Sequence, residues 1–192
     1  MARRGLDAER VVAEAVRIAD ADGLEAVTLA RVAAALGVRT PSLYNHVGGH
    51  EALLRAVALQ GLRELGDALR RAAVGRARGD ALVAVADAYR AYARTHPGRF
   101  AAAVAGRSIR DPALQDAGAD VVAVMVAFVG GWGLADDDAI HAVRAIRSAL
   151  HGFVEIEADG GFDIDLDLDV SFARLVQTLA AGLDAAPAAT RG

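Results

Sequence analysis

The 192-residue sequence contains no cysteine and no lysine, and its longest uninterrupted apolar run is the nine residues Val121–Val129. The absence of cysteine excludes disulfides, thiolate zinc sites and cysteine nucleophiles. A helix needs about 20 apolar residues to cross a bilayer, so we expect no membrane-spanning segment. The first five residues lead directly into charged ones, and we therefore expect a cytoplasmic protein without a signal peptide.

Because lysine is absent, all 21 basic residues are arginines, and the formal net charge is −4. Residues 136–169 hold ten acidic residues and two arginines, a local net charge of −8, whereas residues 23–50 hold two arginines and one glutamate. This asymmetry permits an N-terminal segment that binds an anion on a protein that is acidic as a whole. Arg3 and Arg4 are candidates for further contacts with phosphates or with a minor groove.

The abundance of alanine, leucine, arginine and glutamate, with little alternation of apolar and polar residues, predicts an all-α fold. Residues that favour helix ends delimit three short N-terminal helices: Asp7, Gly23, Thr28, Gly37 and the pair Thr40-Pro41. The third helix is predicted over residues 41–47, and a long helix is predicted from Glu51 to about Gly75. We place a three-helix domain in residues 1–56 and a larger helical domain in residues 57–192.

The last two helices are predicted to begin at residues that favour helix N-termini, one at Asp136–Asp138 and one at Asp169 or Ser171. Between the two helices, aspartates alternate with aliphatic residues over positions 163–170. A calcium-binding EF-hand is excluded, because Leu168 stands where that loop needs glycine and Arg174 where it needs glutamate. We expect an extended connection whose aliphatic side packs on the domain.

Residues 28–47 carry the most information about function. They predict a short helix, a turn at Gly37 and a second short helix, with Ala33 at the close approach and Val38 and Leu43 in the core between them. The second helix leaves short polar side chains outward, which suit contacts with base edges in a major groove: Thr40, Ser42, Asn45 and His46. An ordinary helical hairpin with a polar outer face is the alternative interpretation.

Several features at fixed spacing resemble the DNA-binding end of TetR/AcrR-type transcriptional regulators: Leu36-Gly37-Val38, Leu43-Tyr44, His46-Val47 and Glu51-Ala52-Leu53-Leu54. The resemblance implies an all-helical homodimer of about nine helices per chain, with helix-turn-helix domains that bind a palindromic operator in double-stranded DNA. It also implies a small-molecule effector. This molecule would bind the C-terminal domain and change the spacing of the two DNA-binding domains.

The resemblance further implies which residues contact DNA. Thr28 lies at a helix N-terminus, where its hydroxyl and the exposed amides can hold a phosphate. Tyr44 is expected to bind a backbone phosphate, the alternative being a half-buried packing residue. The other expected contacts come from the recognition helix and its start: Arg39, Thr40, Pro41, Ser42, Asn45 and His46. His50 stands where the family usually has lysine, and its imidazole is mostly neutral at pH 7, which predicts weaker and pH-sensitive binding.

Later segments resemble a ligand domain named for a Trp-His-Gly motif: residues 96–100, 150–153, 161–162 and 172–175. Leu150 departs from that motif, because it stands where tryptophan is expected. Aromatic walls with a few polar groups predict a ligand pocket, and its candidate residues are Tyr89, Tyr92, Phe100, Met125, Phe128, Trp132, Arg147 and His151. The same set fits a core with a buried ion pair, so both interpretations stay open.

Surplus apolar surface on the last two helices predicts how two chains associate. Each helix has more apolar surface than one core can cover, so we expect both to pair with their copies as a four-helix bundle. The expected interface residues are Leu150, Gly152, Phe153, Leu175 and Leu179. The alternative is that the helix containing residues 121–129 covers these faces within one chain.

The sequence points to no catalytic group, cofactor or metal. His46 and His50 are separated by Gly48-Gly49, which interrupts the helix that a metal pair would need. His151 and Glu155 lack a nucleophile and an oxyanion-stabilising partner. We expect a non-enzymatic, sequence-specific DNA-binding regulator, a repressor that a small molecule releases. The alternative is a helical homodimer that binds a small molecule or a protein and has lost operator binding.

Overall fold

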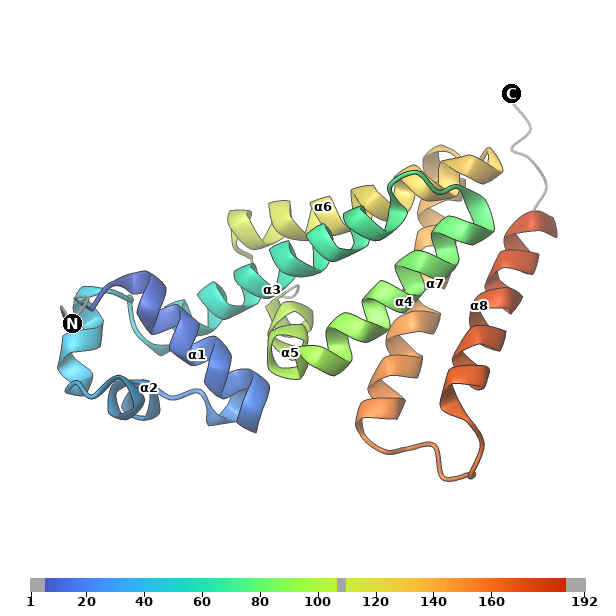
Figure 1. Ribbon diagram of the computed structural model, residues 1–192. Helices are drawn as coiled ribbons and strands as arrows, with labels where there is room; N and C mark the ends of the chain where they lie inside the picture. Colours follow the sequence, from blue (N-terminus) through green and yellow to red (C-terminus); the bar gives the residue numbers. More distant parts are fainter. Residues whose placement is uncertain (1–5, 107–109, 186–192) are drawn as a thin grey trace. The chain divides into compact units, whose positions relative to one another are not determined.

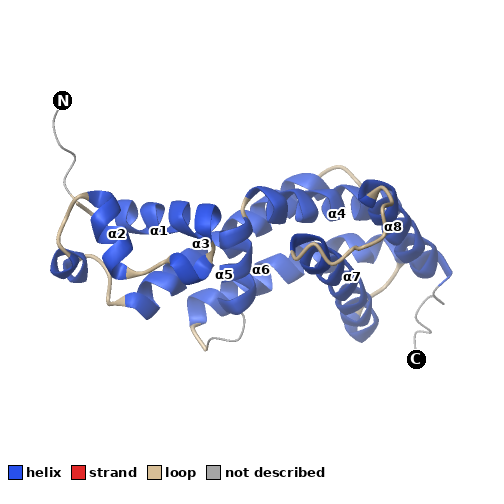
Figure 2. Ribbon diagram, turned by 90° about the horizontal axis from the view of Figure 1, so that it is seen from below, coloured by secondary structure: helices blue, strands red, loops and turns tan. Residues whose placement is uncertain are grey.

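The computed structural model describes residues 6–106 and 110–185. Within these ranges the chain is helical and contains no strand (Figure 2). In chain order the elements are α1 (Ala8–Asp22), η1 (Leu24–Ala26), α2 (Leu29–Leu36), η2 (Thr40–Asn45), α3 (His50–Ala73), α4 (Arg78–Thr95), α5 (Pro97–Gly106), α6 (Pro112–Val129), η3 (Gly130–Trp132), α7 (Asp136–Ala158) and α8 (Leu168–Ala185). The predicted all-α fold is confirmed, and η2 takes the place of the predicted third helix.

The chain divides into two compact units, and Figure 1 labels their helices. Unit 1 comprises Met1–Glu64 and Thr95–Gly118, and unit 2 comprises Leu65–Arg94 and Ala119–Gly192. Both α3 and α6 therefore contribute one part to each unit. The predicted boundary between a DNA-binding domain (residues 1–56) and a larger helical domain (residues 57–192) is a division by function, and it stays a prediction. The packing units differ from it because α5, which comes later in the chain, packs against α1.

The ends of α1 and α2 lie at the residues that the sequence marks. The Asp7 carboxylate accepts a hydrogen bond from the Arg10 amide at 2.8 Å, and the Thr28 hydroxyl accepts one from the Arg31 amide at 3.1 Å. Gly37 ends α2 at a φ of 69°, in the left-handed region that favours glycine. These three predicted helix ends are confirmed.

Three later helices differ from the prediction. The third helix is a 3₁₀ helix, a form that short helical segments often take. In α7 the N-cap is Ala135, without a side-chain hydrogen bond, so the predicted aspartate caps lie inside the first turn and face the helix dipole. In α8 the cap is the Asp167 carboxylate, which accepts a hydrogen bond from the Asp169 amide at 2.8 Å.

In unit 1, α5 packs directly on the end of α1. Gly98 is buried, and a Cβ there would overlap the backbone of Ala19. Asp20 accepts hydrogen bonds from the amide and the Nε of Arg99, at 2.9 and 2.8 Å, while the Arg99 Nη1 donates to Glu64. Burial lowers the pKa of Arg99, but the hydrogen bond to Asp20 and the charge of Glu64 outweigh it, so the pKa is raised. The cluster ties α1, α3 and α5 together.

In unit 2, a buried arginine ties α4 to α7 and α8. Arg90 is 6% exposed, and its Nε donates to Glu157 at 2.9 Å while its Nη1 pairs with Asp169 at 2.8 Å. The guanidinium lies 4.6 Å from the centroid of the Phe172 ring. The hydrogen bond from Arg90 lowers the pKa of Glu157, although burial alone would raise it. Glu157 is therefore held as a carboxylate against the buried Arg90.

The connection between α7 and α8 does not pack as predicted. Ile164 is 75% exposed and Leu166 is 68% exposed, so the aliphatic side of this segment faces solvent. The reason is local, since the Leu166 amide donates to the Ile164 carbonyl at 2.8 Å and Asp167 caps α8. A tight turn thus replaces the extended connection.

One helical segment in the described part of the chain, Pro112–Trp132, is apolar and long enough by composition to cross a membrane, with a mean hydropathy of 1.5. The segment is not one uninterrupted apolar run, because it contains Asp116 and Asp120. One third of its most apolar window is buried. Core helices of soluble proteins meet the same criterion, so this property does not by itself indicate a membrane span.

Candidate nucleic-acid interface

The segment from α2 to η2 folds as a helix-turn-helix. The Val38 amide donates to the Ala33 carbonyl at 3.0 Å and closes the turn that follows Gly37. Val32 and Ala33 of α2 and Leu43 of η2 are buried in the core of unit 1. Because these side chains anchor both helices, the opposite face of η2 is left to solvent.

The residues predicted to contact DNA gather on and beside η2. Tyr44 is 60% exposed, so it is not the half-buried packing residue that the sequence allowed as an alternative. The other members of the predicted set are exposed or partly exposed: Arg39, Thr40, Pro41, Ser42, Asn45 and His46. A tyrosine hydroxyl, an arginine and short polar side chains are thus presented from one short helix and its start.

Thr28 lies at the start of α2, as predicted, and is exposed. Its hydroxyl oxygen accepts the Arg31 amide, so its hydrogen remains for an acceptor such as a phosphate oxygen. The Arg31 side chain is paired with Asp22 at 2.6 Å. Arg3 and Arg4, the other predicted phosphate contacts, lie outside the described residues.

His50 has a contact that the sequence did not reveal. Its Nε2 lies 2.6 Å from the carbonyl oxygen of Val27. A carbonyl oxygen only accepts, so Nε2 carries the hydrogen and donates it. The bond fastens the start of α3 to the residue before the α2 cap. The two residues are 23 positions apart, and no local pattern links them.

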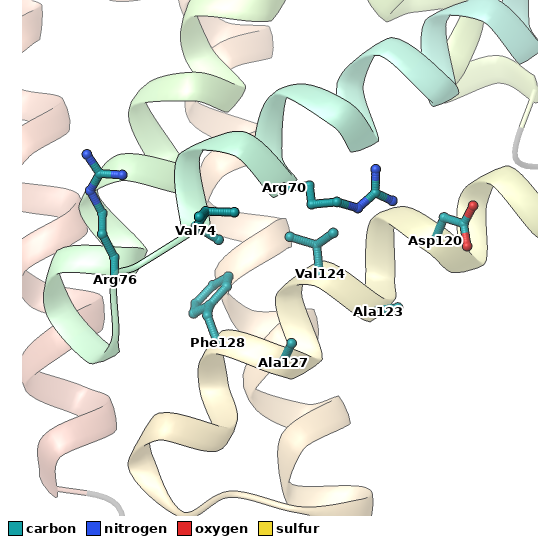
Figure 3. A pocket seen from close by; sticks show the side chains of 9 residues that line it. Arg70, Val74, Arg76, Asp120, Ala123, Val124, Ala127 and Phe128 are labelled. Atoms are coloured by element: carbon teal, nitrogen blue, oxygen red, sulfur yellow. The ribbon is translucent and has the colours of Figure 1, made fainter.

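The predicted ligand-pocket residues occupy different environments. Five of them are buried: Tyr89, Tyr92, Phe100, Met125 and Phe128. Phe100 belongs to unit 1 and the rest to unit 2. The Tyr89 hydroxyl lies 3.3 Å from Nδ1 of His151, and Trp132 donates from Nε1 to Asp184 at 2.8 Å. Arg147 is exposed on α7. Of the eight residues, Phe128 lines the surface groove shown in Figure 3.

The predicted dimer residues fall into two groups. Leu150 is 1% exposed within a single chain, so the structure corrects its assignment to an interface. One side of α7 is buried by the chain itself and cannot meet a partner. The other four residues remain open in part: Phe153, Leu175 and Leu179 are partly exposed, and a Cβ at Gly152 would meet no atom within 4 Å.

Fold and site together define a helix-turn-helix DNA-binding protein with a larger helical domain. Residues 11–57 match the family of bacterial regulatory proteins called tetR, and residues 82–179 match the tetracyclin repressor-like C-terminal domain. The chain is 38% identical over 183 residues to the HTH-type transcriptional regulator Rv0681 of Mycobacterium tuberculosis, a match that covers 93% of this chain and 82% of the relative.

Two further comparisons add detail. The HTH-type transcriptional repressor DrrR1 of Streptomyces coeruleorubidus is 55% identical over 49 residues, 26% of this chain and 18% of that protein. A Rhodococcus protein of known structure has the same fold, with a TM-score of 0.82 at 23% identity over 95% of this chain and 97% of that one.

The chain therefore belongs to the tetR family of bacterial regulatory proteins and is a DNA-binding transcriptional regulator. The resemblance found in the sequence is confirmed. Of the two functions that the sequence left open, regulation through DNA is the one supported. The Trp-His-Gly subgroup stays a prediction.

Proposed function

We propose that the protein is a cytoplasmic, non-enzymatic repressor that binds a palindromic operator as a homodimer and leaves it when a small-molecule effector binds. Regulators of this family bind operators and effectors, typically as dimers. The similarity of the N-terminal segment to a named repressor supports repression over activation.

The solvent-facing surface of η2 is the observation that carries operator binding. Phosphate contacts set the position of a protein on DNA, and base contacts set its sequence preference. We assign positioning to the hydroxyls of Thr28 and Tyr44. We assign base recognition to the side chains that η2 and its start present: Arg39, Thr40, Pro41, Ser42, Asn45 and His46.

Selection of bound sequences from a random DNA pool tests this proposal. We expect a two-fold symmetric motif with half-sites about 34–36 Å apart, or a multiple of that spacing. Affinity is expected to fall steeply with salt, because several phosphates are neutralised in each complex. Asn45→Ala is expected to change the selected motif. Failure to enrich any sequence at low salt would contradict operator binding.

Helices α7 and α8 lie side by side (Figure 1). The homodimer is proposed to form through their partly exposed residues Gly152, Phe153, Leu175 and Leu179. Gly152 is the sharpest probe of this surface. A side chain there meets open space within one chain, so Gly152→Leu is compatible with a folded subunit. We expect this variant to sediment as a monomer and to lose operator binding.

Gly118→Leu is the matched control, because a side chain at Gly118 on α6 also meets no atom within 4 Å. This control is expected to stay dimeric. A dimer that persists in Gly152→Leu, or a folded wild-type monomer at micromolar concentration, would contradict the proposed interface.

A further inference from the structure

A groove of about 420 Å³ lies on unit 2 between the second half of α3 and the second half of α6 (Figure 3). Its walls are apolar and come from both helices: Ala73, Val74, Ala123, Val124, Ala127 and Phe128. Arg76 lies at one end of the groove, and Arg70 and Asp120 lie at the other. Small-molecule sites have about this volume and this mixture of apolar walls with few polar groups.

Small side chains keep the groove open. The two helices are in close contact at Gly66, where a Cβ would lie 3.4 Å from Val121. Further along, alanines line the groove, and they are too short to fill the space between the helices. Val74 is 69% exposed as a result. Apolar surface that is left in water in this way is stabilised when an apolar molecule covers it.

The charges at the two ends differ. At one end, Arg70 is paired with Asp67 at 2.5 Å, and Asp120 lies at the same end of the groove (Figure 3). At the other end, the Arg76 Nη1 donates to the Ala72 carbonyl at 2.9 Å. Within residues 6–106 and 110–185 no carboxylate pairs with Arg76. An arginine that pairs with no carboxylate in the described part of the chain therefore marks one end of an apolar groove.

We infer that this groove binds a linear apolar molecule with one anionic head, such as a medium-chain alkyl carboxylate, and that this molecule is the effector. The carboxylate binds at Arg76, and the chain lies along the apolar walls towards Asp120. The stretch of α6 from Asp120 to Phe128 is about 12 Å long, which sets the length of the chain. This inference rests on the proposed repressor function and names the chemical class of its ligand.

Calorimetric titration of the full-length protein with decanoate, in the absence of DNA, tests the site. We expect one molecule bound per chain, with decanol, decyltrimethylammonium and butyrate each binding more weakly. Arg76→Gln removes one charge-assisted contact and is expected to weaken decanoate binding roughly tenfold. Ala127→Trp fills the groove and is expected to abolish binding.

Two control substitutions lie outside the groove. Arg71→Gln removes an exposed arginine of α3 that does not line the groove, and Val83→Ser removes an exposed valine of α4. Both are expected to bind decanoate like the wild type. Equal affinities of Arg76→Gln and Arg71→Gln, or undiminished binding by folded Ala127→Trp, would overturn the site. So would a change of oligomeric state in Ala127→Trp, because the groove would then belong to an interface between copies.

A separate measurement distinguishes failure of this inference from failure of the proposed repressor. Operator affinity is measured by fluorescence anisotropy with and without saturating decanoate. We expect decanoate to weaken operator binding by about fivefold or more. Decanoate that occupies the groove without changing operator affinity would overturn the effector assignment and leave operator binding intact. Failure of the DNA-pool selection would overturn the repressor even if decanoate binds.

Discussion

Each compact unit contains an arginine that pairs with carboxylates on neighbouring helices, but the two arginines hold their helices by different means. In unit 1, the joint between α5 and α1 is made largely by backbone. Gly98 lies against the backbone of Ala19, and Asp20 receives both the amide and the side chain of Arg99. The close packing of α5 on α1 depends on the absence of a side chain at Gly98.

In unit 2, the joint of α4 with α7 and α8 is made by side chains alone. The buried Arg90 pairs with Glu157 and with the exposed Asp169, and its guanidinium lies over the Phe172 ring. The strength of this joint depends on the carboxylates that compensate the buried Arg90 charge. Added side-chain volume should therefore destabilise the joint in unit 1, and removal of a charge should destabilise the joint in unit 2. The two effects can be tested independently by separate substitutions.

The largest expected effect is that of Glu157→Ala. This change leaves the Arg90 charge buried with only the exposed Asp169 as a partner, and such losses cost about 3–5 kcal/mol of unfolding free energy. Urea denaturation measures it. The double variant Arg90→Met/Glu157→Leu replaces the pair with apolar side chains and is expected to lie closer to the wild type. If the double variant is as unstable as Glu157→Ala, the loss comes from packing and not from charge.

The next effect tests the joint in unit 1. Gly98→Ala places a methyl group on the backbone of Ala19, and overpacking of this kind costs about 1–3 kcal/mol or more. Gly118→Ala is the matched control, since its methyl group meets no atom within 4 Å and should be neutral or slightly stabilising. Only Gly98→Ala is therefore expected to lower the urea midpoint of unfolding. Equal shifts would contradict a joint that depends on shape.

The parts of this fold that could be predicted from the sequence are those set by near neighbours. Asp7, Thr28 and Gly37 act within one turn of their own helices, so their residue types indicate the helix ends directly. The same reasoning gave the surface of η2, because buried Leu43 fixes which residues face outward. It did not give the 3₁₀ form of η2.

The parts that could not be predicted are contacts between residues far apart in the chain. His50 and Val27 are 23 positions apart, Arg90 and Glu157 are 67 apart, and Arg99 and Asp20 are 79 apart. No periodicity or cap links such residues. For the same reason, the sequence could show that Leu150 is apolar but not that its own chain buries it.

A smaller effect is the pH dependence of stability, which should differ between the charge-dependent joint of unit 2 and the shape-dependent joint of unit 1. The Arg90 hydrogen bond holds the pKa of Glu157 below its ordinary 4.5, so folding stabilises the carboxylate. This contribution is complete above pH 4.5 and is lost as the pH falls through the lowered pKa of the folded state. The gap in urea midpoint between wild type and Glu157→Gln is therefore expected to shrink below pH 4.5. The gap between wild type and Gly98→Ala provides the comparison, because that substitution alters no charge of the joint. A Glu157→Gln gap that stays constant or widens in acid would contradict the charge-dependent joint.

The smallest expected effect concerns what unit 1 presents to solvent. Tyr44→Phe keeps the ring and removes a hydroxyl that makes no contribution to the core, so the unfolding free energy should not change. Loss of one hydrogen bond to a phosphate costs about 0.5–1.5 kcal/mol per subunit. Because phosphates carry no sequence information, the loss should be equal on operator and on unrelated DNA. Asn45→Ala is the contrast, since loss of a base contact should weaken operator binding more than non-specific binding. Fluorescence anisotropy on both DNAs measures the two variants. A Tyr44→Phe effect confined to the operator would show that this hydroxyl reads bases, and an effect on unfolding would show that it supports the fold.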